Sequence, residues 1–342
     1  MKISFIIILF FFFHSNLIAS DNLKFFIKKA LENNLELNAE RKNFESSKQS
    51  KNISRSEFFP SITLSGDQTS STSSNRTNQS GESLADTSLD SENKTISVEQ
   101  KIFSGFKGVN VFKKSQLEVK KAQLELKKVE QKTILNAASA YFDLIYKSKN
   151  EKFNLSNVNL FERQVESDSV RLQKGEITLT DLAQSESSLA GAKASLIKAQ
   201  TELLASKANF KKIIRESPPE VEILKENISL DLPKSLNLSL NLASQNNVDL
   251  LLSDLTFQIS VKESNIEKAR LSPSASINFS KSEKKDFSTT IDEKDDETVK
   301  ATITWPIIKG GENISSIKKS SFEKERAKLL FQDTKNKMNL ET

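Results

Sequence analysis

Two short segments of the chain alternate between apolar and polar residues, and each begins directly after a proline. Residues 61–65 follow Pro60, and residues 274–280 follow Pro273. Alternation at every second position is typical of a β-strand with one apolar and one polar face. The charged, glycine-free segments before the prolines favour helix, and proline pushes the residue before it out of the α region. We therefore predict helix-to-strand junctions at Pro60 and Pro273.

A second alternating run follows each of these segments after a polar stretch. The polar stretches, residues 66–94 and 281–298, predict solvated loops. The second runs end at Gly105 and Gly310, and a helical pattern follows each glycine. Their apolar face carries Ile96, Val98, Ile303 and Trp305.

The same order of elements therefore occurs twice along the chain. Pro60 and Pro273 are 213 residues apart, and the same offset separates the segments "ALENNLEL" and "ASQNNVDL". A repeat of this kind indicates a duplicated structural unit. We predict a first repeat over residues 21–217, with helices over 22–57, a β-hairpin over 58–104 and a coiled-coil hairpin over 105–217. The second repeat covers residues 218–342, with a linker and helices over 218–271, a β-hairpin over 272–309 and the start of a long helix over 310–342.

The segment between the two repeats of strands has heptad periodicity. Leucine or phenylalanine recurs every seven residues from Leu182 to Phe210, with serine and alanine at the alternate seam positions. Large residues that face small ones let helices pack closely as a coiled coil. Gly175 interrupts the pattern and can take the left-handed conformation that ends a helix. We predict one helix over about 106–172 and a second over about 180–215, capped by Thr180 or Asp181.

Composition limits the chemistry that the chain can perform. It has no cysteine and a single histidine, His14, so thiolate sites, disulfides and histidine-based triads or metal sites are excluded. The 50 basic and 45 acidic residues are interspersed, which argues against a nucleic-acid partner. Residues 1–20 contain a short apolar run and small residues, as in a secretory signal peptide. We expect an exported chain with no catalytic residues, cofactor or metal.

The amphipathic strands fit two environments. They could form ordinary soluble hairpins on a core, or a lipid-facing barrel with a polar lumen. We favour the barrel because the chain is exported and no element between the paired strands could cover their apolar face. Four strands are too few to close a transmembrane barrel. Either the sheet packs on another element or several chains share one barrel.

Several motifs gain specificity from their order and duplication. They are the two segments "ALENNLEL" and "ASQNNVDL", the junctions at Pro60 and Pro273, the strand exits "IFSGFKG" and "WPIIKGGEN", and the hairpin "RLQKGEITLTDLAQSESSL". Together, over residues 22–342, they resemble the TolC family of outer-membrane efflux channels. The resemblance implies a mainly α fold with β: a duplicated helix–β-hairpin–long-helix repeat, with a twelve-stranded barrel and an α-helical tunnel shared by a homotrimer.

The resemblance also implies sites and partners. The tip at Arg171, Lys174, Gly175 and Glu176 would dock a periplasmic adaptor protein, and Thr180 and Asp181 would form the entrance latch. Lys174 and Glu176 stand where the family has apolar residues, so charge pairing would replace apolar contact. Ile96, Val98, Ile303 and Trp305 would face outer-membrane lipid.

The expected function is a passive export duct across the outer membrane and periplasm. The chain would be a subunit of a tripartite efflux or type I secretion system. An inner-membrane pump, whose class the sequence does not indicate, would supply the energy. The alternative is a structural periplasmic coiled-coil or adhesin-like surface protein. After Gly310 only 32 residues follow, against 112 between Gly105 and Ser217. By that comparison we expect a counterpart hairpin of about 80 residues to be missing from this chain.

Overall fold

The computed structural model describes residues 22–220, 233–288 and 290–342. The predicted signal peptide at 1–20 and most of the predicted linker after residue 220 lie outside the described residues. The chain divides into two compact units, residues 1–40 with 128–232 and residues 41–127 with 233–342. These units do not follow the two sequence repeats, because helices α2 (Leu35–Arg55) and α3 (Lys107–Gln173) each contribute to both.

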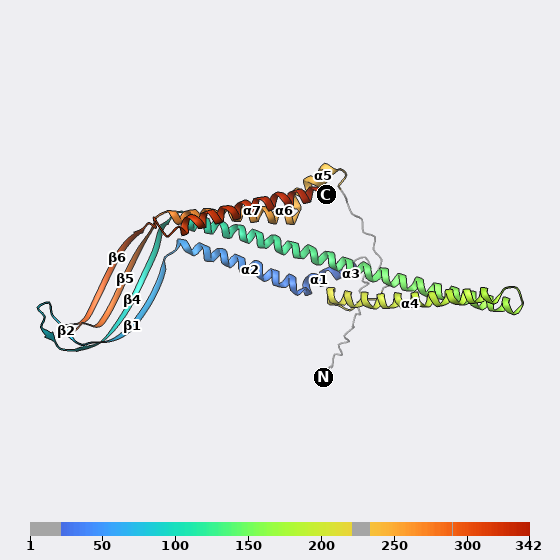
Figure 1. Ribbon diagram of the computed structural model, residues 1–342, viewed down its shortest axis with the longest axis horizontal. Helices are drawn as coiled ribbons and strands as arrows, with labels where there is room; N and C mark the ends of the chain where they lie inside the picture. Colours follow the sequence, from blue (N-terminus) through green and yellow to red (C-terminus); the bar gives the residue numbers. More distant parts are fainter. Residues whose placement is uncertain (1–21, 221–232, 289) are drawn as a thin grey trace, which may run out of the picture. The chain divides into compact units, whose positions relative to one another are not determined.

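The first unit is built from helices. It contains α1 (Asn22–Asn33), the start of α2, the later part of α3 and α4 (Leu179–Ile214). The later part of α3 and α4 run antiparallel as a hairpin (Figure 1). On α4 the heptad positions Ala199, Ser206 and Phe210 are buried, whereas most positions between them are exposed. The seam predicted from the heptads is therefore the face that α4 packs against its neighbours.

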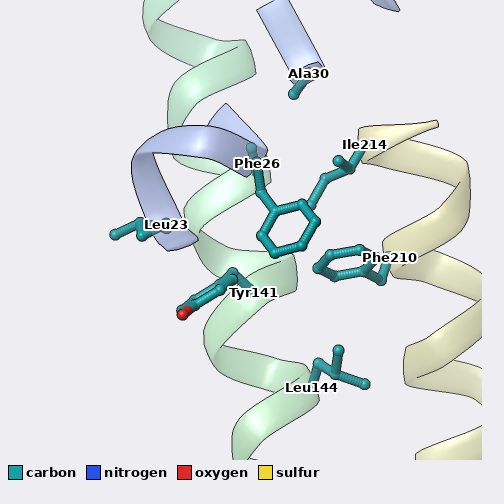
Figure 2. Packing of buried hydrophobic residues seen from close by; sticks show 8 residues of the cluster. Leu23, Phe26, Ala30, Tyr141, Leu144, Phe210 and Ile214 are labelled. Carbon is teal, nitrogen blue, oxygen red and sulfur yellow. The ribbon is translucent and has the colours of Figure 1, made fainter. Parts of the chain in front are cut away.

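The core of this unit lies where three helices meet. Figure 2 shows Phe26 of α1 directed toward Phe210 of α4 and Tyr141 of α3. The Phe26 and Phe210 rings pack edge to face, with centroids 5.1 Å apart, and the Phe26 and Tyr141 centroids are 6.1 Å apart. Leu144 and Ile214 belong to the same cluster and are fully buried. Aromatic packing of this kind anchors the short α1 on the longer helical hairpin.

The second unit joins helices to a sheet. Its strands β1 (Ser61–Ser73), β4 (Thr87–Ser104), β5 (Ser274–Ser288) and β6 (Ile291–Thr304) lie side by side in that order, and all neighbours are antiparallel (Figure 1). Two-residue strands β2 (Arg76–Thr77) and β3 (Ser83–Leu84) pair separately between β1 and β4. The helices are the rest of α2, the start of α3, α5 (Leu236–Asn246), α6 (Val248–Lys268) and α7 (Glu312–Glu341), with 3-10 turns η2 (Ser56–Phe58) and η4 (Ala269–Leu271).

The strands are longer than the sequence predicts. Most of residues 66–94 and 281–298, predicted as loops, belong to β1, β4, β5 and β6. The ladder started by the apolar segments continues through the polar residues, where neighbouring strands remain paired. Two ion pairs link β5 and β6 there. Lys281 lies opposite Glu297 with an Nζ–Oε1 distance of 3.3 Å, and Lys284 Nζ lies 3.2 Å from Asp296 Oδ2. Pairing between strands, which composition does not reveal, decides this region.

The two repeated asparagines play the same local role. Asn34 Oδ1 accepts the backbone N–H of Leu37 at 3.0 Å, and Asn247 Oδ1 accepts that of Leu250 at 2.9 Å. Both asparagines thereby cap the helix that follows, α2 or α6, and both leucines are buried. The duplication seen in the sequence is therefore also a duplication of local geometry. Within the described residues, no helix is both long enough and apolar enough to cross a membrane.

Candidate functional site

The four-stranded sheet has one apolar and one polar face. Its register aligns Ile62, Val98, Phe279 and Val299 in one row across β1, β4, β5 and β6. A neighbouring pair on the same face joins Ala275 to Ile303. The opposite face carries polar side chains, among them Ser61, Glu99, Asn278 and Lys300, which form the adjacent row. Four separate sequence segments thus build one continuous two-faced surface.

The apolar face is open in the described part of the chain. Ile62, Val299 and Ile303 are 69%, 73% and 79% exposed, and Ile96 is 42% exposed. Contiguous apolar surface of this kind marks an interaction with a partner or a lipid phase. Along the strands the same face becomes charged at the row of Ile96. In that row Lys281 of β5 and Glu297 of β6 lie in register with Ile96. The apolar surface is therefore a band between the helical end of the sheet and a charged zone.

One of the predicted strand residues lies outside the strand. Strand β6 ends at Thr304, so Trp305 follows it and is not a strand residue. The indole Nε1 donates to the carbonyl of Leu271 at 3.0 Å, and the side chain is 62% exposed. This hydrogen bond ties the strand end to the 3-10 turn η4 before Pro273. The alternation of the sequence continues past the point where the ladder stops.

The junctions between helices and strands are tight. Pro60 directly precedes β1, and Pro273 directly precedes β5. Gly105 follows β4 with φ +61, and a Cβ there would lie 2.4 Å from the Cβ of Ser272. Gly310 follows β6 with φ +52, with open space around it. Gly105 is thus required by both backbone conformation and close approach, whereas Gly310 is required by conformation alone.

The tip of the helical hairpin ends α3 in a Schellman motif. The N–H of Gly175 donates to the carbonyl of Leu172, and that of Glu176 donates to the carbonyl of Arg171, both at 2.9 Å. Gly175 has φ +75. Arg171 Nε lies 3.4 Å from Glu176 Oε2, while Lys174 is exposed. The tip therefore presents one internal ion pair and one additional cation.

The cap of α4 differs from the prediction. Thr178, rather than Thr180 or Asp181, is the N-cap, because the helix already begins at Leu179. Asp181 occupies the third helical position, where its Oδ2 accepts the Thr178 N–H at 2.8 Å. Thr178 Oγ1 accepts the Asp181 N–H in return at 3.3 Å, so the two form a capping box. The backbone hydrogen bond from Thr178 lowers the pKa of the Asp181 carboxyl.

One buried carboxylate near the tip, that of Asp168, was not predicted from the sequence. The side chain of Asp168 on α3 is 7% exposed, and its Oδ2 accepts Ser185 Oγ of α4 at 2.6 Å and Gln164 Nε2 at 2.8 Å. The Ser185 hydrogen bond, followed by that of Gln164, lowers the pKa of Asp168. Arg171 Nη1 lies 3.6 Å from Asp168 Oδ1. The sequence offered one indication of this contact. Ser185 is a small polar residue at a seam position of the heptads, where its hydroxyl faces the neighbouring helix.

The tip also carries an apolar side chain that was not predicted. Leu179, in the first turn of α4, is 71% exposed. Thr180 and Asp181 beside it are exposed as well. Among the described residues, no group of three or more His, Cys, Asp or Glu side chains could hold a metal ion. What the tip offers is a surface of mixed charge with one exposed leucine.

A sheet with an exposed apolar face, joined to a long helical hairpin in a duplicated chain, defines a class of membrane-associated channel subunit. The family model described as "Outer membrane efflux protein" matches residues 26–214, more than half of the chain, and the chain belongs to this family. Among curated relatives, the outer membrane efflux protein BepC of Brucella suis is 26% identical over 206 residues. That match covers 59% of this chain and 42% of BepC.

Solved structures share the fold. VceC, the outer membrane protein of Vibrio cholerae, matches with a TM-score of 0.78 at 16% identity, covering 92% of this chain and 75% of VceC. The CmeC outer membrane channel of Campylobacter jejuni also has a TM-score of 0.78 at 16% identity, covering 92% of this chain and 67% of CmeC. At these identities the likeness concerns the fold. The predicted fold class, mainly helical with a sheet and similar to the TolC-family channels, is confirmed.

Proposed function

We propose that the chain is a subunit of an outer-membrane export channel and carries solutes passively, without a chemical step. The observation that carries the proposal is the exposed apolar face of the four-stranded sheet, where Val299 and Ile303 are 73% and 79% exposed. Lipid is the partner that such a band fits, and the polar face would then line an aqueous path. The family of the matching model consists of efflux proteins, which supports this reading.

The open edges of the sheet support a homotrimer. Strands β1 and β6 are the outer strands of the sheet, so each leaves one row of backbone groups without a ladder partner among the described strands. Such edges pair readily with another chain. Four strands cannot close a membrane barrel, whereas three copies would supply twelve. In this arrangement β1 of one copy would pair with β6 of the next.

The hairpin tip would dock a periplasmic adaptor protein, which in turn would bind an inner-membrane pump. Arg171 and Glu176 satisfy each other at 3.4 Å, so Lys174 is the charge most available to a partner. Leu179 adds an apolar contact beside it. Docking would combine one charge pair with burial of this leucine, in place of contact through the apolar residues that flank the glycine in the resembled family.

Thr180 and Asp181 would contribute to closing the tunnel entrance. Asp181 Oδ2 is engaged in the capping box with Thr178, and no hydrogen bond to Oδ1 or to the Thr180 hydroxyl occurs within the described residues. Oδ1 and the Thr180 hydroxyl are therefore the atoms that could contact another helix. The low pKa keeps the Asp181 carboxyl ionised for such a contact.

Cysteine labelling tests the channel directly, because the chain has no cysteine of its own. Val299→Cys and Thr302→Cys would be expressed in outer membranes and treated with a water-soluble maleimide. We expect Thr302→Cys to react from the aqueous path and Val299→Cys to react only with a lipid-soluble reagent. Rapid labelling of Val299→Cys by the water-soluble reagent would contradict lipid exposure.

Membrane fractionation distinguishes the channel from the alternative function, a structural coiled-coil or adhesin-like protein. The helical hairpin has its own buried cluster around Phe210, which would suit a free-standing coiled coil. A channel subunit should stay with the membrane in a carbonate wash and size as a trimer in detergent. Release by carbonate, with monomeric size, would favour the alternative.

A further inference from the structure

A cavity of about 420 Å³ lies where the sheet meets the helices. Its lining comes from the ends of β4, β5 and β6, from the turn η4, from Glu57 of η2 and from the start of α3. Glu99, Ser276 and Thr302 place the cavity on the polar face of the sheet. Cavities of this size commonly hold small-molecule ligands.

Cations outnumber carboxylates among the residues that line the cavity. Four cations line it, Lys101, Lys107, Arg270 and Lys309, against the two carboxylates Glu57 and Glu99. Lys101 Nζ lies 3.2 Å from Glu57, and Arg270 contacts Glu267 at 2.6 Å and Glu312 at 3.2 Å. Neither Lys107 nor Lys309 has an ion-pair partner among the described residues. Two ammonium groups are therefore available to a ligand.

Hydroxyl groups surround these charges. They come from Ser104, Ser272, Ser274, Ser276, Thr302 and Thr304. Gly105 lets the chain pass close to Ser272, because any Cβ at Gly105 would lie 2.4 Å from the Ser272 Cβ. That approach places the start of α3, and Lys107 with it, beside the strand ends. Hydroxyl donors together with unpaired ammonium groups are the chemistry that binds oxyanions.

We propose that this cavity is a binding site for small oxyanions, namely solutes that carry phosphate or carboxylate groups. The site stands on the geometry of the junction alone. A role for this site in binding anionic solutes during export rests on the proposed function, because the polar face lines an export path only if the chain forms a channel.

The single tryptophan of the chain reports on the site. Trp305 lies between Thr304 and Pro306, both of which line the cavity, and its indole is fixed by the bond to Leu271. The purified chain in detergent would be titrated with sodium phosphate and with citrate at constant ionic strength, with chloride as the reference anion. Tryptophan emission and isothermal calorimetry would be recorded together. We expect a saturable response to phosphate or citrate and none to chloride.

The matched variants neutralise two lysines inside or outside the cavity. Lys107→Gln with Lys309→Gln should weaken binding about tenfold, because each lysine contributes a factor of about three through a solvent-exposed ion pair. Lys318→Gln with Lys328→Gln removes the same charge from exposed positions of α7 outside the cavity and should leave affinity unchanged. Lys107→Arg with Lys309→Arg keeps the charge and should keep binding.

The proposal is overturned if neither method detects saturable binding in folded wild-type protein, or if both neutralised pairs bind equally well. Circular dichroism would establish folding of each variant. If the double glutamine variant does not fold, the single variants Lys107→Gln and Lys309→Gln replace it, and each should weaken binding about threefold. No pore is needed for these measurements. Loss of channel activity would therefore not mimic loss of binding, and absent binding would leave the channel proposal intact.

Discussion

At the scale of single residues, glycines and one buried carboxylate set the local geometry. The interruption of the heptads predicts the role of Gly175, and the structure has it at φ +75 at the end of α3. The close approach of Gly105 to Ser272 could not be predicted, because the two residues are distant in sequence and only sheet formation brings them together. Asp168 was missed because its partner Ser185 lies on the other helix, and the sequence pattern does not show which residues of the two helices face each other.

Gly105→Ala should destabilise the protein by about 2–4 kcal/mol, because a positive φ and a clash with Ser272 act together. Gly191→Ala is the matched control: it lies within α4 with nothing within 4 Å of an added Cβ, so it should stabilise the helix by up to about 1 kcal/mol. Thermal unfolding followed by circular dichroism measures both. Equal effects of the two variants would contradict the close approach.

Asp168 should make the stability of the helical hairpin depend on pH. Its folded pKa is lowered, so its stabilising contribution is present above the unfolded pKa of about 3.9 and is lost as pH falls through the folded value. Asp168→Asn, which can still accept the Ser185 hydroxyl, should flatten the fall in melting temperature below about pH 4. Parallel pH profiles of wild type and variant would show that the Asp168 carboxylate does not cause the fall in melting temperature. Asp181, whose pKa is also lowered, is present in both proteins and so contributes equally.

At the scale of elements, alternation and heptads predict which faces pack, but not how far an element extends. The apolar rows of the sheet and the seam of α4 follow the sequence pattern. The polar halves of the strands do not, because they are ordered by pairing with the neighbouring strand, as where Lys281 lies opposite Glu297. The cap of α4 likewise depends on the actual first turn, which Thr178 begins.

Phe210→Ala should cost about 3–5 kcal/mol, since the ring is fully buried against Phe26 and its removal leaves a cavity among three helices. Leu204→Ala, on the exposed face of the same helix at 69% exposure, should change stability by less than about 0.5 kcal/mol. Denaturant unfolding monitored on the helical signal compares them. A small effect of Phe210→Ala would mean that the cluster does not anchor α1.

Val299→Arg should impair membrane insertion, whereas Thr302→Arg should be tolerated. Val299 lies in a row that is apolar on all four strands, where arginine in a lipid-facing strand costs up to about 2–4 kcal/mol. Thr302 belongs to the polar face, where the side chain would meet water. Yield in the membrane fraction is the readout, and similar yields for both variants would argue against a lipid-facing band.

At the scale of the whole molecule, the duplication brings β1 and β4 of the first repeat against β5 and β6 of the second. The sheet thereby joins segments that are almost 200 residues apart, such as Val98 and Phe279. A single chain leaves its two edge strands, β1 and β6, without a partner on one side among the described strands. In the proposed trimer these edges would pair between neighbouring copies. The segment matched in BepC covers 42% of that protein.

Cysteines placed on the edge strands should crosslink between copies if three chains share one barrel. Variants that pair one cysteine on β1, such as Thr63→Cys, with one on β6, scanned from Thr298 to Thr302, would be oxidised in the membrane. We expect a ladder ending at a trimer on a denaturing gel at one register of the scan. Cysteines on the inner strands β4 and β5 are the control and should give none.

The sequence by itself determined the duplication, the positions of the strands after Pro60 and Pro273, the two faces of those strands and the seam of the helical hairpin. These follow from periodicity and proline sterics, which act over a few residues. Tertiary structure alone decided the length of the strands, the contact of Gly105 with Ser272, the Asp168–Ser185 bond and the basic cavity at the junction. Each of these depends on residues from different helices or strands, and only the pairing of those elements brings the residues within contact distance.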